Sequence, residues 1–247
     1  MKDFEFTELD KEGRSTLEVI AKADNFNKWM YHTIRPYCSG KILEIGSGIG
    51  NISKFFLESG ADITLSDIRK NYCQYLKKSF QDFPNLNDVL KIDLIDKDFE
   101  EGFKLQAHSY DTIFALNVVE HIKEDNLAIK NCKYLLKPGG TLIILVPADR
   151  FLYNSFDKAL GHYRRYNKST LQSLFLKNDF TILKKEYFNI FGKLGWYISG
   201  KLQKNEVIPK GQMKIFDKLV PVIKHIDKLF LKSFGLSVIV VGKINKK

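Results

Sequence analysis

The sequence predicts a doubly wound α/β fold, with a seven-stranded, mostly parallel sheet and a helical insertion between the last two strands. From residue 41 onward, short apolar runs that resemble strands alternate with helical patterns, which is typical of βαβ units. A glycine-rich turn directly follows the first of these strands. The last two predicted strands lie about fifty residues apart, far more than a hairpin needs.

The seven strands are predicted, in chain order, at residues 41–45, 62–66, 89–92, 110–116, 141–146, 181–187 and 236–244. Apolar residues at helical spacing predict the intervening helices at 52–59, 70–80 and 127–136. The last of these helices should stop at the Lys137-Pro138-Gly139-Gly140 turn.

Two further helices carry recognisable start signals. Asp24 or Asn25 can cap a helix ahead of the sheet, and Asn167 or Ser169 can cap one after the fifth strand. Side-chain oxygens of these residue types accept hydrogen bonds from the free N–H groups of a first helical turn.

Charge is distributed unevenly along the chain, whose formal net charge is +10. Residues 1–150 hold 20 Lys and Arg against 23 Asp and Glu, which leaves 19 against 6 for residues 151–247. The second part suggests an anionic partner, such as a phosphorylated or carboxylated substrate, a membrane surface or nucleic acid. A lysine-rich solvated surface explains the same counts.

The cysteines and the apolar runs bear on location. Cys38, Cys73 and Cys132 are far apart and fit no metal or disulfide pattern, which favours a reducing compartment. No apolar run approaches the ~20 residues of a membrane span, and the first ten residues lack the apolar region of a secretion signal. We therefore expect a cytoplasmic protein.

Residues 44–50 (EIGSGIG) form the strongest local signal, a glycine-rich turn between a strand and a helix. Glycines allow the backbone to approach a ligand closely, and a helix N-terminus offers free N–H groups. Such a turn indicates a nucleotide-like ligand at the carboxyl edge of an open sheet, without specifying which one.

Polar residues at the ends of successive strands sharpen this prediction. They are Glu44 in the first strand, then Asp67, Asp93 and Asn117 after the next three. A carboxylate after the second strand can accept both hydroxyls of a ribose, and an amide can both donate and accept. Each residue alone could equally be a turn or helix cap.

Two ligands compete for this edge. A dinucleotide fingerprint needs a third glycine at position 51, where this chain has Asn51. Together with the strand-end residues, the segments LEIGSGIG (43–50), YDTIFALNVVEHI (110–122) and LLKPGGTLIILVPA (135–148) resemble the class I S-adenosylmethionine-dependent methyltransferases. The resemblance covers about two thirds of the chain and implies the Rossmann-like methyltransferase fold.

The resemblance implies a role for each matched position. The methionine ammonium of S-adenosylmethionine is expected near Glu44 and Asn117, and the ribose on Asp67. The cofactor backbone is expected over Gly46, Ser47 and Gly48, and the adenine beside Ile68, Asp93 and Leu94. The family also lays N-terminal aromatic residues over the cofactor, for which Trp29 and Tyr31 are candidates, although packing of that helix in the core is the favoured role of Trp29.

The domain organisation follows from the same reading. We expect one methyltransferase domain over residues 1–247. It comprises an N-terminal helical cap (1–40), a cofactor-binding core (41–188), a helical lid insertion (189–234) and a final strand with its tail (235–247).

Two histidines are candidates for catalysis. Methyl transfer is an in-line displacement at an activated carbon, and a hydroxyl acceptor benefits from a base. His121 directly follows the fourth strand, and His162 lies in the run 160–166 (LGHYRRY). A structural role is an equal alternative for either residue.

The rest of that run predicts a substrate site. Tyr163, Arg164, Arg165 and Tyr166 combine two guanidinium groups with two phenols, which suits a carboxylate or phosphate ester. The run resembles a subset of bacterial class I enzymes of glycan and secondary metabolism. The alternative is that Arg164 and Arg165 brace the fold through carboxylates such as Asp157 or Glu186.

A metal site is not predicted. Residues 117–121 (NVVEH) are similar to ubiquinone-biosynthesis O-methyltransferases, in which two glutamates and the histidine can hold a divalent metal. The first glutamate is replaced here by Asn117, which weakens that inference.

The predicted insertion contains a basic amphipathic stretch. Apolar residues recur at helical spacing from Ile215 to Phe230, lysines lie between them, and Pro221 interrupts them. It predicts a substrate lid, a dimer surface or a membrane-surface element, or a helix that simply docks on the core.

The sequence thus predicts S-adenosylmethionine-dependent methyl transfer to oxygen or nitrogen of a small molecule, which can be a glycan, lipid-linked or secondary-metabolite intermediate. A nucleic-acid methyltransferase is an alternative suggested by the basic second half. It is disfavoured because residues 117–120 (NVVE) do not match the Asn/Asp-Pro-Pro-Tyr type of adenine enzymes. A nicotinamide-dependent oxidoreductase and a non-catalytic cofactor-binding protein are the remaining alternatives.

Overall fold

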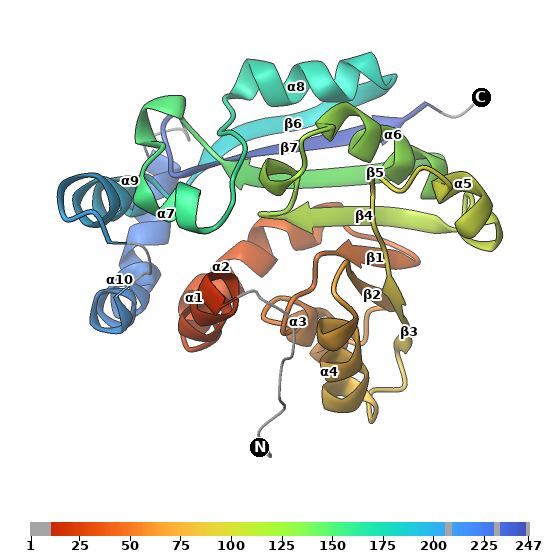
Figure 1. Cartoon of the computed structure of the whole chain (residues 1–247), viewed down its shortest axis with the longest axis horizontal. Coiled ribbons are helices and arrows are strands. Elements are labelled where there is room, and N and C mark those ends of the chain that lie inside the picture. The colour runs from red at the N-terminus through yellow and green to blue at the C-terminus, as the bar shows by residue number, and fades with distance from the viewer. Residues whose placement is uncertain (1–10, 206–208, 230–232, 246–247) are drawn as a thin grey trace.

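The computed structural model of the protein describes residues 11–205, 209–229 and 233–245, and Figure 1 shows one twisted sheet crossing the molecule. The strands lie in the order β3-β2-β1-β4-β5-β7-β6. Their bounds are β1 Ile42–Ile45, β2 Ile63–Asp67, β3 Leu86–Lys91, β4 Tyr110–Leu116, β5 Leu136–Pro147, β6 Phe180–Phe188 and β7 Ser237–Ile244. The first five run parallel, and β7 is antiparallel to both of its neighbours. The predicted doubly wound, mostly parallel sheet is confirmed.

Helices and helical turns connect the strands. Their bounds are α1 Lys11–Ala21, α2 Asp24–Ile34, η1 Arg35–Tyr37, α3 Ser53–Glu58, α4 Lys70–Phe80, α5 Phe99–Gly102, η2 Lys104–Gln106, η3 Val119–His121, α6 Asp125–Leu135, η4 Arg150–Leu152, α7 Ser155–Ala159, α8 Lys168–Lys177, α9 Ile190–Trp196, η5 Tyr197–Leu202 and α10 Lys210–Leu229. The helices α9 and α10 lie between β6 and β7, where the sequence predicts a helical insertion. No helix in the described ranges is both long and apolar enough to cross a membrane.

The sheet separates two hydrophobic cores. One face packs against α5, α6 and α8, with Phe99, Ile129 and Phe175 fully or almost fully buried. The other face packs against α2, α3, α4 and α10, where Ile34 and Phe56 are completely buried. Burial on both faces explains why the central strands are apolar at nearly every position.

The predicted boundaries hold best where apolar periodicity is strong. The bounds of β4 and α4 are those predicted, whereas β5 begins at Leu136, before the proline-glycine turn. Tyr110 pairs with Leu136 and Thr112 with Thr141, so the intervening residues form a bulge inside the strand. The turn therefore interrupts β5 rather than preceding it.

Of the two predicted helix N-caps, one is correct and one is wrong. Asn167 caps α8 by accepting from the Thr170 amide. The prediction that Asp24 or Asn25 caps its helix is wrong, because Asp24 is already helical and Ala23 precedes it without a capping side chain. Asp217 of α10 supplies the missing acceptor, since its Oδ1 lies 2.8 Å from the Phe26 amide.

Candidate active site

The glycine-rich loop lies at the carboxyl edge of the sheet, directly after β1. Gly46 and Gly48 have positive φ values of 71° and 55°. A side chain on Gly46 would also collide with Val118, which follows β4, and one on Gly48 would press against Leu17 of α1. The loop therefore needs glycine at both positions for its conformation and for the close approach of its neighbours.

Asp67 ties this loop to the end of β2. Its Oδ2 accepts from the Gly48 amide at 3.0 Å, and its Oδ1 accepts from the Arg69 amide at 2.9 Å. The carboxylate is 5% exposed. A carboxylate has about four acceptor positions, so this geometry keeps capacity for ribose hydroxyls.

Glu44 is buried beneath the same loop. The Ser53 hydroxyl of α3 donates to its Oε2, and burial raises the pKa of Glu44 to about 7. A buried carboxylate without a cationic partner is costly. The position therefore suits a ligand that brings a positive charge.

The structure distributes the other predicted cofactor residues unevenly. Ile68 is exposed and Asn117 is exposed in a left-handed conformation at φ 56°, whereas Ser47 is buried in the loop. Asp93 is half-buried and accepts from the Ile95 amide, which is a turn contact. Leu94 is 3% exposed and belongs to the hydrophobic core cluster, and its place beside the adenine stays a prediction.

The two aromatic candidates of α2 pack in the interior. The Trp29 ring lies 4.3 Å from that of Phe188, and Tyr31 packs edge-on against Phe56 at 4.9 Å. The core role that the sequence favours for Trp29 is confirmed, and Leu17 of α1 is the residue that lies over Gly48 instead.

The two predicted catalytic histidines meet after β4. Their ring centroids are 4.6 Å apart, and the two ring planes are nearly perpendicular. Nδ1 of His162 lies 2.8 Å from Oδ1 of the fully buried Asp157. Because an ionised carboxylate only accepts, Nδ1 carries a proton, and in the neutral form of the ring Nε2 is the acceptor.

Charge in this cluster is set by burial and by Arg165. Burial acts to raise the pKa of Asp157, but the His162 hydrogen bond and the Arg165 ion pair lower it overall. The ring of His121 keeps part of its surface exposed. Burial by the surrounding protein and, second to it, the neighbouring His162 nevertheless lower the pKa of His121 to about 4.

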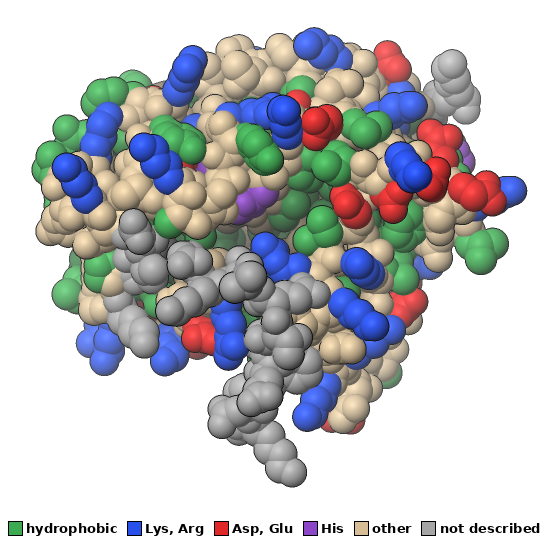
Figure 2. All heavy atoms as spheres, in the orientation of Figure 1, with side chains coloured by type: hydrophobic (Ala, Val, Ile, Leu, Met, Phe, Trp, Pro, Cys, Tyr) green, Lys and Arg blue, Asp and Glu red, His purple; other side chains and the backbone are tan. Residues whose placement is uncertain are grey.

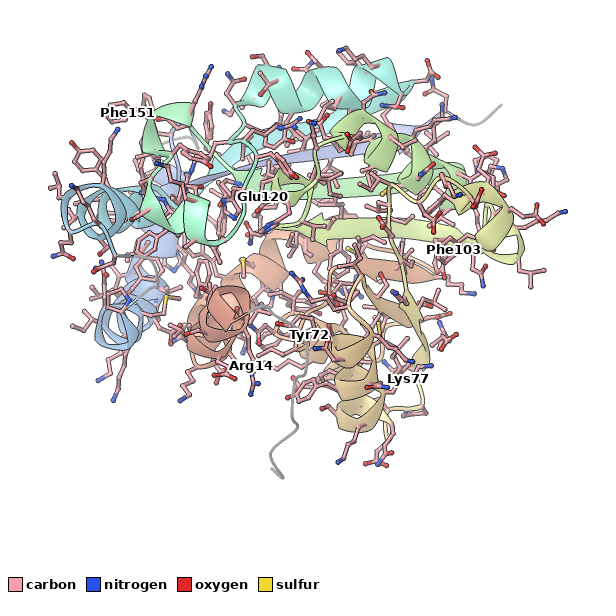
Figure 3. The ribbon with its side chains drawn as sticks, in the orientation of Figure 1. Arg14, Tyr72, Lys77, Phe103, Glu120 and Phe151 are labelled. Carbon is pink, nitrogen blue, oxygen red and sulfur yellow. The ribbon has the colours of Figure 1, made fainter. Side chains whose placement is uncertain are left out.

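Glu120, labelled in Figure 3, has no exposed surface and offers a carboxyl oxygen within 4.8 Å of a ring nitrogen of His121 and of His162. Neither of its carboxyl oxygens has a hydrogen-bond partner in the described part of the chain. Burial raises the pKa of Glu120 to about 8, so the group is largely protonated at neutral pH.

Three of the four predicted substrate residues make internal contacts. Arg165 donates to Asp157 Oδ1 at 2.8 Å, while Arg164 and the Tyr166 hydroxyl both donate to Asp125 Oδ2, at 2.7 and 2.8 Å. Arg165 and Tyr166 are buried, and only Tyr163 is well exposed, at 59%. The bracing role through Asp157, which the sequence left open as the alternative, describes Arg165 in this structure.

A metal-capable group of ligands is present at the same place. Glu120, His121 and His162 each offer one ligand atom, and these atoms lie within 4.8 Å of one another. Two histidines and one carboxylate are a donor set that catalytic zinc sites use. The expectation of no metal stays a prediction.

Sequence reasoning missed two neighbours of the site. The first is Trp196 of α9, whose ring centroid lies 4.9 Å from the guanidinium carbon of Arg165. The second is Ser53, whose hydroxyl donates a hydrogen bond to Glu44. No local sequence pattern pairs Trp196 with Arg165. Ser53 could have been predicted, because it is the first residue of the helix that follows the glycine turn.

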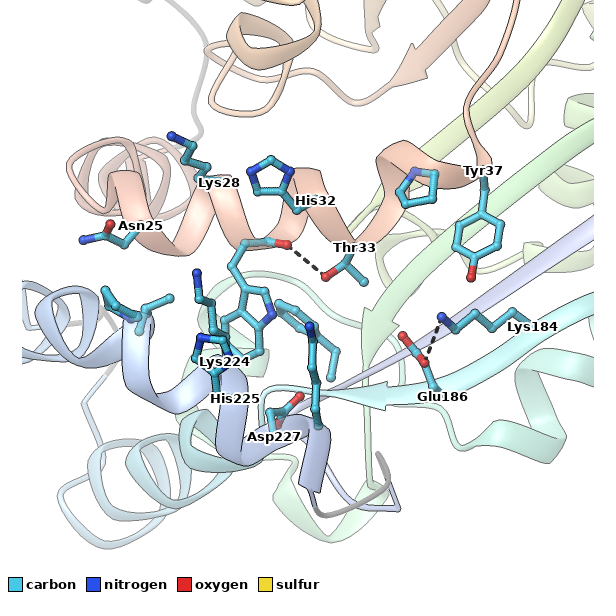
Figure 4. A pocket seen from close by; sticks show the side chains of 16 residues that line it. Asn25, Lys28, His32, Thr33, Tyr37, Lys184, Glu186, Lys224, His225 and Asp227 are labelled. Carbon is cyan, nitrogen blue, oxygen red and sulfur yellow. Dashed lines mark hydrogen bonds and ion pairs between the residues drawn. The ribbon is translucent and has the colours of Figure 1, made fainter.

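The structure also has a cavity away from this edge. It has a volume of about 520 Å³ and lies between α2, β6 and α10 (Figure 4). Its lining includes Trp29, Phe188, Val220, Lys224 and His225. Trp29 is a candidate to lie over the cofactor, but none of the predicted catalytic or substrate residues is among the lining residues.

Comparisons with known proteins agree with this geometry. A family model described as a methyltransferase domain matches residues 43–142. A highly reducing polyketide synthase of Strobilurus tenacellus is 30% identical over 148 residues, which are 57% of this chain and 5% of that protein. The chain spans only a small part of the curated relatives that it matches.

Solved structures share the fold. An S-adenosylmethionine-dependent methyltransferase from Archaeoglobus fulgidus gives a TM-score of 0.58 at 17% identity, covering 88% of this chain and 94% of that one. A Haemonchus contortus phosphoethanolamine N-methyltransferase 2, in complex with phosphomonomethylethanolamine and S-adenosylhomocysteine, gives 0.61 at 17% identity, covering 96% and 59%. The family match identifies a methyltransferase domain over residues 43–142, and the sheet order and the glycine loop give the chain the fold of the S-adenosylmethionine-dependent methyltransferases.

Proposed function

We propose that the protein transfers the methyl group of S-adenosylmethionine to an oxygen or nitrogen of a small-molecule acceptor. The observation that carries the proposal is the hydrogen bond from the Gly48 amide to the Asp67 carboxylate. This bond holds the carboxylate against the glycine loop, where it would bind the ribose. Glu44 would face the methionine ammonium, and Asn117 would complete the amino-acid end. Ile68 and Asp93 would flank the adenine.

The acceptor would lie beside His162 and Tyr163. With Nδ1 of His162 bonded to Asp157, Nε2 is available to take a proton from an acceptor hydroxyl as the methyl group transfers. Neutral His121 would line the same place, and the exposed phenol of Tyr163 would contact the acceptor. Lysines of the second half would favour an anionic or lipophilic acceptor.

The relatives support this choice of acceptor. Polyketide synthases build secondary metabolites, and the Haemonchus contortus enzyme is described with a small phosphorylated amine. A glycan, lipid-linked or secondary-metabolite intermediate therefore fits the proposal as the acceptor. An intracellular location fits a reaction whose methyl donor, S-adenosylmethionine, is a soluble metabolite.

Changing Asp67 to alanine tests the cofactor site. The variant should bind S-adenosylhomocysteine about 100-fold more weakly, because two charge-assisted hydrogen bonds to ribose are lost at ~1.5 kcal/mol or more each. Isothermal titration measures the affinity, and Asp62→Ala serves as the control, since Asp62 is an exposed carboxylate at the opposite edge of the sheet. Unchanged affinity in Asp67→Ala would show that the cofactor binds elsewhere.

Cofactor affinity should also depend on pH through Glu44. Its pKa of about 7 in the free protein means that a proton must leave before the carboxylate can pair with the ammonium. Affinity should therefore rise as pH increases from about 6 to 8, with proton release, and should level off above the pKa. Titration in buffers of different ionisation enthalpy measures the released proton. The Glu44→Gln variant should bind weakly with no such pH dependence; the same dependence in that variant would contradict the role of Glu44.

A further inference from the structure

The helix α10 presents two apolar faces, of which the described ranges cover only one. Met213, Val220 and Ile223 are at most 8% exposed and pack towards α1, α2 and the sheet. On the other side, Ile215, Leu219, Val222 and Leu229 are 64%, 51%, 61% and 78% exposed. Their spacing of four, three and seven residues places them on one stripe of the helix.

Lysines lie along one flank of this apolar stripe. Lys214 and Lys218 are exposed on the arc beside the stripe, and neither pairs with a carboxylate in the described ranges, whereas Lys224 and Lys228 line the cavity between α2, β6 and α10. Figure 2 shows basic side chains along the lower left edge of the molecule, where α10 lies in Figure 1.

The acidic residues of α10 are both turned inward. Asp217 accepts from the Phe26 amide at 2.8 Å, and Asp227 accepts from the Ile190 amide at 2.7 Å. The outer surface of the helix is therefore apolar and cationic, because neither acidic residue of α10 lies on it beside Lys214 and Lys218. A second copy of the chain would meet it with the same cations, whereas an anionic lipid surface is complementary to it.

We propose that the stripe Ile215, Leu219, Val222 and Leu229, with its flanking lysines, docks the protein on an anionic membrane surface. A helix with a strongly apolar face and lysines on its polar side lies in the plane of the interface, with the apolar side chains among the acyl chains. Long lysine side chains keep their ammonium groups at the level of the lipid phosphates.

The neighbouring α9 and η5 extend the same kind of surface. Leu194 and Leu202 are 61% and 63% exposed, and α9 also carries Trp196, which lies under Arg165 beside the Asp157–His162 pair. If the proposed methyl transfer takes place there, α9 connects its exposed Leu194 to the His162 site through the contact between Trp196 and Arg165. This step rests on the proposed function; the docking itself does not.

Sedimentation with vesicles tests the docking without any methyl-transfer reaction. The full chain should bind vesicles of phosphatidylcholine with phosphatidylglycerol, bind pure phosphatidylcholine much less, and lose affinity as salt rises. The Leu219→Glu/Val222→Glu variant should bind at least about tenfold more weakly, since two apolar side chains no longer enter the bilayer. The Lys214→Gln/Lys218→Gln variant should lose about fivefold per lysine on anionic vesicles only.

Matched controls keep the result interpretable. The Leu105→Glu/Leu183→Glu variant changes two leucines that are 91% and 51% exposed on other elements, and it should bind vesicles like the unchanged chain. S-adenosylhomocysteine binding by every variant confirms folding. Unchanged vesicle binding by the stripe variant would overturn the proposal. So would no vesicle binding by the unchanged chain, or a dimer in sedimentation velocity that the stripe variant abolishes while vesicles do not bind.

Discussion

Replacing Asp157 with alanine should lower the free energy of unfolding by about 3–5 kcal/mol, the usual cost of removing one partner from a buried ion pair. Asp157 is fully buried, and its Oδ1 accepts from both Arg165 Nε and His162 Nδ1 at 2.8 Å. Its Oδ2 accepts from the Asn154 amide and closes the cap of α7. Alanine would leave the Arg165 charge buried and unpaired, because the Arg165 side chain is 0% exposed.

Urea denaturation followed by circular dichroism measures this loss. The matched control is Asp24→Ala, which removes an ion pair with Lys54 of 2.6 Å whose aspartate side chain is 73% exposed. Exposed pairs contribute about 1 kcal/mol or less, so the control should be nearly neutral. Equal losses in the two variants would mean that Asp157 does not hold the segment as the structure indicates.

The second large effect is expected on the rate of methyl transfer. The His162→Asn variant keeps a donor for Asp157 but removes the acceptor nitrogen that faces the site. Transfer to a hydroxyl acceptor should slow about 100-fold or more, the usual contribution of a positioned base. Affinity for S-adenosylhomocysteine should stay within about twofold, because no cofactor contact is assigned to His162 and a twofold change is about 0.4 kcal/mol.

Single-turnover kinetics with radiolabelled S-adenosylmethionine separates the chemical step from binding. The control is His32→Asn, which changes an exposed histidine of α2 that lines the remote cavity. A His162→Asn variant with the rate of the unchanged chain would remove His162 from the chemistry and leave its bond to Asp157 as a structural contact only.

The cofactor edge was accessible to sequence reasoning because its residues are defined locally. Glu44 lies in β1, Asp67 ends β2, and parallel strands bring such ends together whatever the connections do. Leu94 makes a contact that this argument does not predict. It belongs to the hydrophobic core, and its carbonyl accepts from the side-chain amide of Asn131 of α6.

The acceptor side could not be predicted in the same way, because its contacts join distant segments. Whether Arg164 faces solvent or Asp125 depends on how the segment after β5 folds over α6, which no local period encodes. Likewise, the two apolar faces of α10 look alike in the sequence, and only packing distinguishes the covered face from the exposed one.

The capping of α2 by Asp217 has a consequence for the order in which the chain folds. The Phe26 amide and its acceptor are 191 residues apart, so a ribosome releases α2 long before α10 exists. Until then the first turn of α2 lacks this partner, and an uncapped helix of this length is marginal in water. The contact joins segments that are far apart in the sequence, and loop closure over such a span is slow. The helix α2 is thus expected to take its final place only after α10 has been synthesised.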